Sequence, residues 1–184
     1  MALIEQDETG QVANANAYIT AAFFQSYHLD RGADVDLFDV DEQINPAIIL
    51  ATDYADSKYA GEYTGSRKIS GAIRQTTQWP RDAAYDRDGY DVSDSIPDIL
   101  MQVIAEYAME AIDPDGGVVP LTEVFNDSKD RSVKLLKEKV DVIETVTEYH
   151  NNGQAATTKD FPKPDMMIES LLKFSASNNQ ILRV

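Results

Sequence analysis

Residues 95–112 read SIPDILMQVIAEYAMEAI, and their apolar side chains recur at helical spacing. Ser95 suits the position that caps the free amides of a helix, Pro97 suits its first turn, and Asp98 suits the positive end of its dipole. The stretch that follows, residues 113–117, reads DPDGG and ends the helix. Apolar residues extend around much of the cylinder. We therefore predict a central helix that other elements cover on more than one side.

Two further helices are predicted before the central one. Thr20 can cap a short aromatic helix, which the sequence DRG at residues 30–32 would end. A longer helix over residues 47–59 carries one apolar stripe, and it is the natural partner of the central helix. Between these two helices, acidic and apolar residues alternate over residues 33–42. We predict an acidic loop there, with Phe38 turned inward.

The chain is less regular after residue 117. The β-branched residues and partial alternation of residues 132–149 predict two strands or one long bent strand, because the junction at Asp141 lacks a tight-turn signal. Asp165 can cap a short helix. A polar spacer then precedes a short apolar tail, which we expect to dock on a neighbouring subunit or partner. The docking residues of this tail are Ile181, Leu182, Arg183 and Val184.

These elements predict a mainly α fold. It is a small helical bundle around the central helix at residues 95–112, with a C-terminal β-strand or hairpin extension and a terminal arm. We divide the chain into an N-terminal arm at residues 1–17, a helical core at residues 18–117, and a β extension with docking tail at residues 118–184. The length of 184 residues suits one core with an appendage.

Composition excludes several classes of function. With 32 acidic and 16 basic residues, the net charge of −16 opposes sequence-independent binding to nucleic-acid phosphates. The absence of cysteine excludes disulfides, thiolate metal sites and a cysteine nucleophile. We see neither a secretion signal nor an apolar run of membrane-spanning length, so we expect no membrane partner.

Residues 60–90 show no regular period, but they hold the only tryptophan of the chain. A long irregular segment in a small domain is either functional or packed down by its own aromatic residues. Its aromatic and basic residues could together stack single-stranded DNA, although nearby aspartates cancel much of the charge. Packing into the core is the interpretation that we favour. The predicted structural anchors are Trp79, Pro80, Tyr85, Tyr54 and Tyr107, and the mixed aromatic and basic set is Tyr59, Tyr63, Arg67, Lys68, Arg74, Trp79, Arg81, Tyr85 and Arg87.

No pattern of catalytic residues emerges. When Gly89 is aligned with the glycine of a calcium loop, Asp86 and Asp88 fall on ligand positions, but two principal ligands are missing. The dispersed carboxylates give no sign of converging on a two-metal site. The two histidines, His28 and His150, lack a metal-binding or nucleophile context. We therefore expect no enzyme activity, no metal and no cofactor.

Several short motifs, in their order and spacing, resemble a known family. They are Asn16-Ala17-Tyr18-Ile19-Thr20, Ala51-Thr52-Asp53-Tyr54, Gln78-Trp79-Pro80-Arg81, Tyr85-Asp86-Arg87-Asp88-Gly89 and Ile96-Pro97. Together they are similar to the tailed-phage family often labelled DnaT-like single-stranded-DNA-binding, whose members resemble head-tail adaptor, connector or head completion proteins. The similarity covers residues 13–112 well and the later segments more loosely. The acidic loop at residues 34–42 and a longer insertion at residues 62–77 depart from the pattern.

The resemblance implies a structural virion protein. Such a subunit forms a ring of about twelve copies beneath the portal protein, joins capsid to tail and continues the DNA channel. Its implied partners are further copies of itself, the portal, tail or neck proteins, and double-stranded genomic DNA that passes without specific binding. The protein would be made in the host cytoplasm and reside in the virion. The alternatives are a DnaT-like replication protein that binds single-stranded DNA and, as a distant third, a metal-dependent nuclease.

Overall fold

Helix α3 (Asp98–Ala111) lies at the centre of the fold, as its sequence predicts. The helix begins at Asp98 because Pro97 has an extended backbone and occupies the N-cap position. Ser95 does not cap it, since the hydroxyl of Ser95 donates to the carbonyl of Val92 instead. At the other end Ile112 leaves the helical conformation.

The computed structural model describes residues 2–69, 71, 73–122, 133–139, 144–149 and 160–173, and of residues 133–139 and 144–149 it describes only the backbone. The chain divides into two compact units. One contains residues 1–121 and 161–184, and the other contains residues 122–160. This division differs from the predicted boundary at residue 118, because the last helix belongs to the same unit as the helical core.

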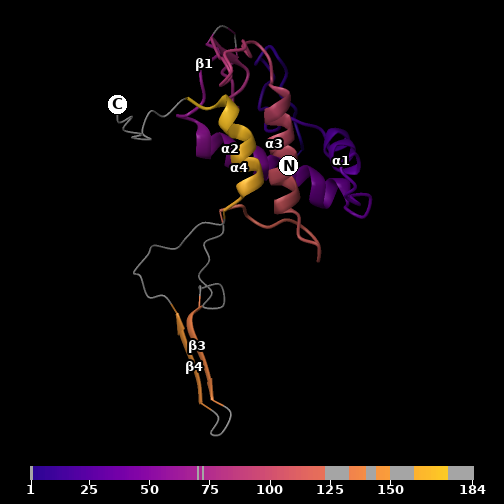
Figure 1. Cartoon of the computed structure of the whole chain (residues 1–184). Helices are drawn as coiled ribbons and strands as arrows, with labels where there is room; N and C mark the ends of the chain where they lie inside the picture. Colours follow the sequence, from indigo (N-terminus) through magenta and orange to yellow (C-terminus); the bar gives the residue numbers. More distant parts are fainter. Residues whose placement is uncertain are drawn as a thin grey trace, which may run out of the picture. The chain divides into compact units, whose positions relative to one another are not determined.

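Three helices contact α3 in the first unit: α1 (Ala21–Leu29), α2 (Asn45–Tyr59) and α4 (Pro162–Ile168). Figure 1 shows α2 running across α3 while α4 lies alongside it. Thr20 caps α1 as predicted, and its hydroxyl accepts a hydrogen bond from the amide of Phe23. Helix α4 begins at Pro162, so Asp165 lies in its first turn rather than at its cap. A short 3-10 helix, Glu169–Leu171, follows α4.

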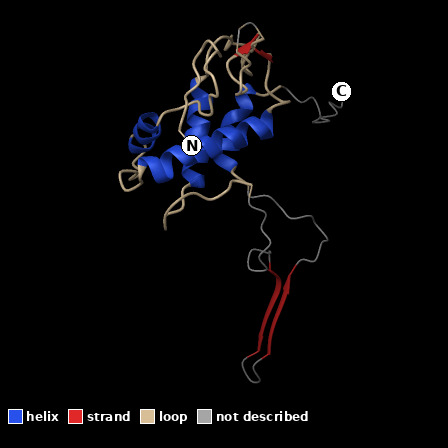
Figure 2. Ribbon diagram, turned by 180° about the vertical axis from the view of Figure 1, so that it is seen from behind, coloured by secondary structure: helices blue, strands red, loops and turns tan. Residues whose placement is uncertain are grey.

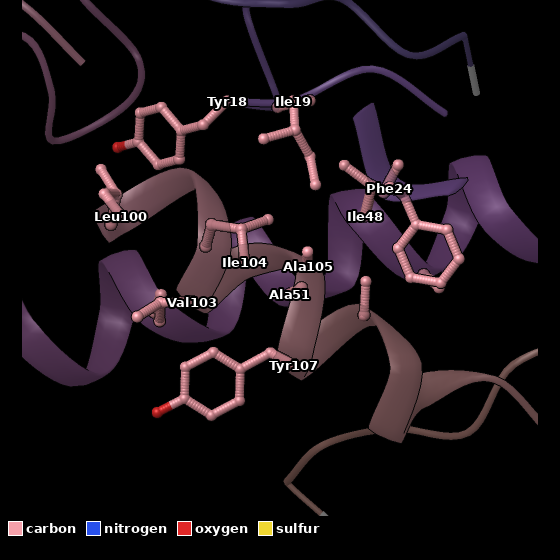
Figure 3. Packing of buried hydrophobic residues seen from close by; sticks show 14 of the residues in the cluster. Tyr18, Ile19, Phe24, Ile48, Ala51, Leu100, Val103, Ile104, Ala105 and Tyr107 are labelled. Carbon is pink, nitrogen blue, oxygen red and sulfur yellow. The ribbon is translucent and has the colours of Figure 1, made fainter. Parts of the chain in front are cut away.

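The hydrophobic core surrounds α3 on several sides, as Figure 3 shows. Burial of each large aliphatic side chain here stabilises the fold by roughly 1.5–3 kcal/mol. Small residues allow α2 and α3 to approach closely, among them Ala51 and Ala108, which are fully buried. Leu121 and Phe161 are both buried in this core, although 39 residues of the chain lie between them in sequence. The core residues labelled in Figure 3 are Tyr18, Ile19, Phe24, Ile48, Ala51, Leu100, Val103, Ile104, Ala105 and Tyr107.

The predicted N-terminal arm packs on the first unit instead of extending from it. The amide of Gln6 donates to the carbonyl of Ala17 (2.8 Å), and the amide of Asn16 donates to the carbonyl of Ile4 (2.9 Å). The buried side chain of Gln6 also reaches Thr77, with 3.0 Å between Nε2 and Oγ1. A segment with few apolar residues is thus held mainly by hydrogen bonds.

The acidic segment between α1 and α2 is a loop followed by one turn of π-helix, Val40–Ile44. The carboxylate of Asp39 caps this turn by accepting from the amides of Asp41 and Glu42 (2.8 Å each). Phe38 packs partly against the core, as predicted, whereas Leu37 is 81% exposed.

Two small antiparallel sheets complete the described structure (Figure 2). Strand β1 (Ser66–Arg67) pairs with β2 (Arg81–Asp82) in the first unit. In the second unit β3 (Val133–Lys139) pairs with β4 (Glu144–Tyr149). The alternative that the sequence left open is therefore an antiparallel pair and not one bent strand. The predicted docking tail at residues 181–184 lies outside the described residues. Among the helices of the described ranges, none has the length and apolar character that a membrane span requires.

Candidate functional site

The irregular segment between α2 and α3 is built around Trp79. Its side chain is fully buried, and its ring packs edge to face against Tyr63, with 5.7 Å between ring centres. The peptide bond to Pro80, which is also buried, is cis. The amide of Trp79 donates to the hydroxyl of Tyr18 (3.1 Å). Trp79 thus anchors the segment in the core, and its indole face is not available for stacking on a nucleic-acid base.

Arg81 in β2 connects this part of the segment to the two residues that precede β1. Its side chain is almost fully buried, and three of its nitrogens donate to backbone carbonyls: Nε to Thr64 (2.7 Å), Nη2 to Gly65 (2.9 Å) and Nη1 to Gln78 (3.2 Å). Gly65 has a φ of +65°, and a side chain there would collide with the carbonyl of Asp82. The guanidinium of Arg81 is therefore committed to structure and is not free to bind phosphate.

A partly buried carboxylate, Asp56, connects α2 to this segment. Its Oδ1 accepts from the hydroxyl of Tyr18 (2.7 Å), and its Oδ2 accepts from the amide of Gln78 (2.9 Å). Burial raises the pKa of Asp56 to about 7, although these hydrogen bonds favour the charged form. Asp56 is therefore a carboxyl group that changes charge near neutral pH.

We expect Asp56 to make stability depend on pH. Because the pKa of Asp56 is higher in the folded chain than its ordinary value of 3.8, its contribution is fully present below pH 3.8 and is lost as pH rises to about 7. The free energy of unfolding of the wild type, relative to that of Asp56→Asn, should fall across this range. Urea titrations of both proteins between these pH values measure the difference. A relative stability that instead rises with pH would contradict the assignment.

The other predicted anchors differ in their environments. Tyr107 is fully buried, and Tyr54 packs edge to face against it with 5.0 Å between ring centres. Phe161 lies 5.6 Å from each of these two rings. Tyr85 is not a core anchor, because 49% of its surface is exposed. Tyr85 lies next to a turn in which the carboxylate of Asp86 accepts hydrogen bonds from the amides of Asp88 and Tyr90. This turn directs the side chain of Tyr85 toward solvent.

Sequence analysis did not find the polar cluster that attaches α4 to the bundle. The carboxylate of Asp165 accepts from Lys58 (2.7 Å), from the hydroxyl of Tyr59 (2.9 Å) and from the hydroxyl of Tyr107. Burial alone would raise the pKa of Asp165, but the three donors together lower it. The donors come from two other helices, and no local sequence signal links them to Asp165.

A basic groove of about 460 Å³ follows β1 on the surface. Two isoleucines in it are unusually accessible, with 89% of Ile69 and 41% of Ile73 exposed. Lys68 is paired with Asp94 (2.7 Å), but neither Arg67 nor Arg74 forms a salt bridge with any residue that the structure describes. The groove is lined by Arg67, Lys68, Ile69, Gly71, Ile73, Arg74 and Gln75.

Within the described part of the chain, no three acidic or histidine side chains gather closely enough to hold a metal ion. His28 is buried on α1, and its Nε2 lies 3.0 Å from the carbonyl of Ala105, which gives it a structural contact. His150 lies outside the described residues. The mixed aromatic and basic set of the sequence separates into three groups: the buried residues Tyr59, Tyr63, Trp79 and Arg81, the residues of the basic groove, and the exposed Tyr85 and Arg87.

Comparison with known proteins gives one match. A family model described as "Putative DnaT-like ssDNA binding protein" matches residues 1–184. No curated protein and no solved structure matches the chain. The match spans both compact units of the structure.

Proposed function

We propose that this chain, which belongs to the family described as "Putative DnaT-like ssDNA binding protein", is a structural virion protein. The support for this function is the resemblance of its sequence motifs to those of phage head-tail adaptors, and not the family description. In this proposal it is an adaptor that forms a ring beneath the portal, joins capsid to tail and continues the DNA channel. Its partners are further copies of itself, the portal and a tail or neck protein. We assign it no catalytic step and no cofactor.

The burial of Tyr63, Trp79 and Arg81 within the irregular segment is the observation that carries the proposal. Single-stranded DNA binding of the stacking type requires exposed aromatic rings beside free cations. Here the rings of Trp79 and Tyr63 are fully buried, and Arg81 is bonded to backbone carbonyls. These residues are therefore not available to stack on or bind DNA bases. Their burial favours the structural subunit over the DNA-binding protein.

The second unit supports the same proposal. Its described part is one antiparallel pair, β3 and β4, and a sheet of two strands alone is at best marginally stable in water. Each strand of such a pair has an outer edge that can accept a strand from another chain. An assembly provides such neighbours.

A mass measurement of the purified protein, alone and mixed with portal protein, tests the proposal. We expect an oligomer of defined size in at least the mixture, bound to the portal, because a ring subunit contacts both its own copies and the portal. A protein that stays monomeric and ignores the portal at the highest soluble concentration would contradict the adaptor function. A matched mixture with an unrelated ring protein of similar charge controls for non-specific association.

Replication-associated binding of single-stranded DNA is the second candidate. The description of the family favours it, and so does the basic groove, where Arg67 and Arg74 have no described salt-bridge partner. The net charge of −16 opposes it.

We predict weak or undetectable binding of the free protein to single-stranded DNA near physiological salt. The two arginines of the groove that form no salt bridge with a described residue provide few phosphate contacts, and the net negative charge of the chain repels a polyanion. Fluorescence anisotropy of a labelled single-stranded oligonucleotide at several salt concentrations measures the affinity. Tight binding that weakens steeply with salt, and that Arg67→Glu abolishes, would put the replication function first.

A further inference from the structure

We propose that two copies of this chain bind head to tail, with the acidic loop of one copy seated in the basic groove of the next. The acidic loop is residues 34–42, and the basic groove is the surface lined by residues 67–69, 71 and 73–75. The inference rests on the proposed function, because it names the contact by which the ring would form. Beyond the proposed function, the inference identifies the two surfaces, their residues and the head-to-tail direction of the contact.

The acidic loop and the basic groove carry opposite charge. Residues 34–42 contain five acidic side chains and no basic one. Residues 67–75, which include the groove, contain three basic side chains and no acidic one, in a chain whose acidic residues outnumber its basic residues by 32 to 16. Of the three, Lys68 is already paired with Asp94 of the same copy. Opposite charges on two separate surfaces of one subunit are complementary between copies.

Both surfaces also expose apolar side chains. Leu37 and Val40 of the acidic loop are 81% and 39% exposed, and Ile69 and Ile73 of the basic groove are 89% and 41% exposed. Apolar groups surrounded by charged ones mark a surface that another protein covers. A nucleic-acid backbone would leave these isoleucines without an apolar partner, so the groove fits a protein surface better than a phosphate chain.

The fold holds the two surfaces apart. The acidic loop leads into the N-terminal end of α2, and the basic groove follows its C-terminal end by way of Tyr63 and β1. A 15-residue helix spans roughly 22 Å. Strand β1, which contains Arg67, and helix α1, which precedes the acidic loop, lie on opposite sides of α3 (Figures 1 and 2). One copy therefore presents two different patches, and pairing of unlike patches produces a ring or a filament.

The loop is shaped before it binds. The carboxylate of Asp39 caps the π-helical turn, and the side chain of Gln43 donates to the carbonyl of Asp113 (3.1 Å). These contacts hold the loop against the end of α3. Because a preformed loop loses little conformational freedom on docking, its charged residues can contribute directly to affinity.

A charge exchange between two variants tests the contact. The groove variant is Arg67→Glu with Arg74→Glu, and the loop variant is Asp34→Lys with Asp36→Lys. None of these four side chains forms a hydrogen bond or salt bridge with another described residue, so both variants should fold. Each alone should weaken self-association at least about tenfold, because like charges then meet at the contact. An equimolar mixture should restore association, since the altered groove of one variant then faces the altered loop of the other.

Sedimentation velocity or native mass spectrometry of each variant and of the mixture gives the readout. Asp88→Lys with Asp115→Lys, two exposed aspartates elsewhere, matches the charge change of the loop variant and should leave association unchanged. If the wild type associates but the variants associate equally well, or the mixture fails to recover, the head-to-tail contact is overturned while the adaptor function stands. If the wild type stays monomeric at the highest soluble concentration, both alone and in the mixture with portal protein, both fail. If the groove variant loses single-stranded DNA binding and keeps self-association, the groove is a DNA site and the contact is overturned.

Discussion

Replacing Trp79 with alanine is expected to lower the free energy of unfolding by about 3–5 kcal/mol, the usual cost of removing a large buried aromatic side chain. The indole is fully buried and contacts the ring of Tyr63, and the guanidinium carbon of Arg81 lies 6.0 Å from the centre of its ring. Its removal leaves a cavity where the irregular segment meets the core. It also removes an aromatic neighbour of the buried charge of Arg81. Urea denaturation followed by circular dichroism measures the change.

Two control variants separate this effect from a general loss of aromatic character. Trp79→Phe keeps most of the apolar volume and should cost less than the alanine variant. Tyr85→Ala removes an aromatic residue six positions away whose side chain is half exposed, and it should change stability by less than about 1 kcal/mol. A Trp79→Ala protein as stable as the wild type would show that the indole is not part of the core.

Replacing Asp165 with alanine is expected to cost about 2–3 kcal/mol. The change removes three hydrogen bonds at once and leaves the hydroxyls of Tyr59 and Tyr107 without the acceptor that connects them to α4. Hydrogen bonds to a charged group are worth about 1.5–3 kcal/mol each when buried, and partial exposure of Asp165 and Lys58 reduces that sum. Thermal and urea denaturation provide the measurement.

The carboxylate of Asp165 also gives this variant a pH signature. Because the pKa of Asp165 is lowered in the folded chain, its stabilisation is present above the ordinary value of 3.8 and is lost as pH falls below it. The wild type and the alanine variant should therefore converge in stability in acid. Asp160→Ala changes an exposed aspartate near the start of the same helix and should have little effect at any pH. Equal losses from both substitutions would show that the Asp165 cluster contributes nothing specific.

The helices were predictable because their signals are local. The apolar period of residues 98–111, the cap at Thr20 and the stripe of residues 47–59 each lie within one stretch of sequence. The packing of the N-terminal residues was not predictable, because it depends on a hydrogen bond between Gln6 and Thr77 that no local pattern encodes.

In the candidate site, too, some features could be predicted from the sequence and others could not. The burial of Trp79 follows from the size of its side chain in an otherwise polar segment. The exposure of Tyr85 does not follow, since a tyrosine can satisfy its hydroxyl in water as well as in a core, and the turn at Asp86 decides its direction. The basic groove corresponds to a run of sequence without acidic residues. The sequence does not show that Lys68 of this run pairs with Asp94, because the two residues are far apart along the chain.

The burial of both Leu121 and Phe161 in one core has a consequence for how this protein can vary in evolution. The chain leaves the helical unit after Leu121 and returns to it at Phe161. Residues 122–160 are therefore an insertion within the helical unit. The free-energy cost of closing a loop grows slowly with its length, by about 0.6 kcal/mol for each doubling. Evolution can therefore lengthen, shorten or exchange this insert with little penalty to the helices. Homologous proteins could therefore differ in the insertion alone and keep the same helical unit.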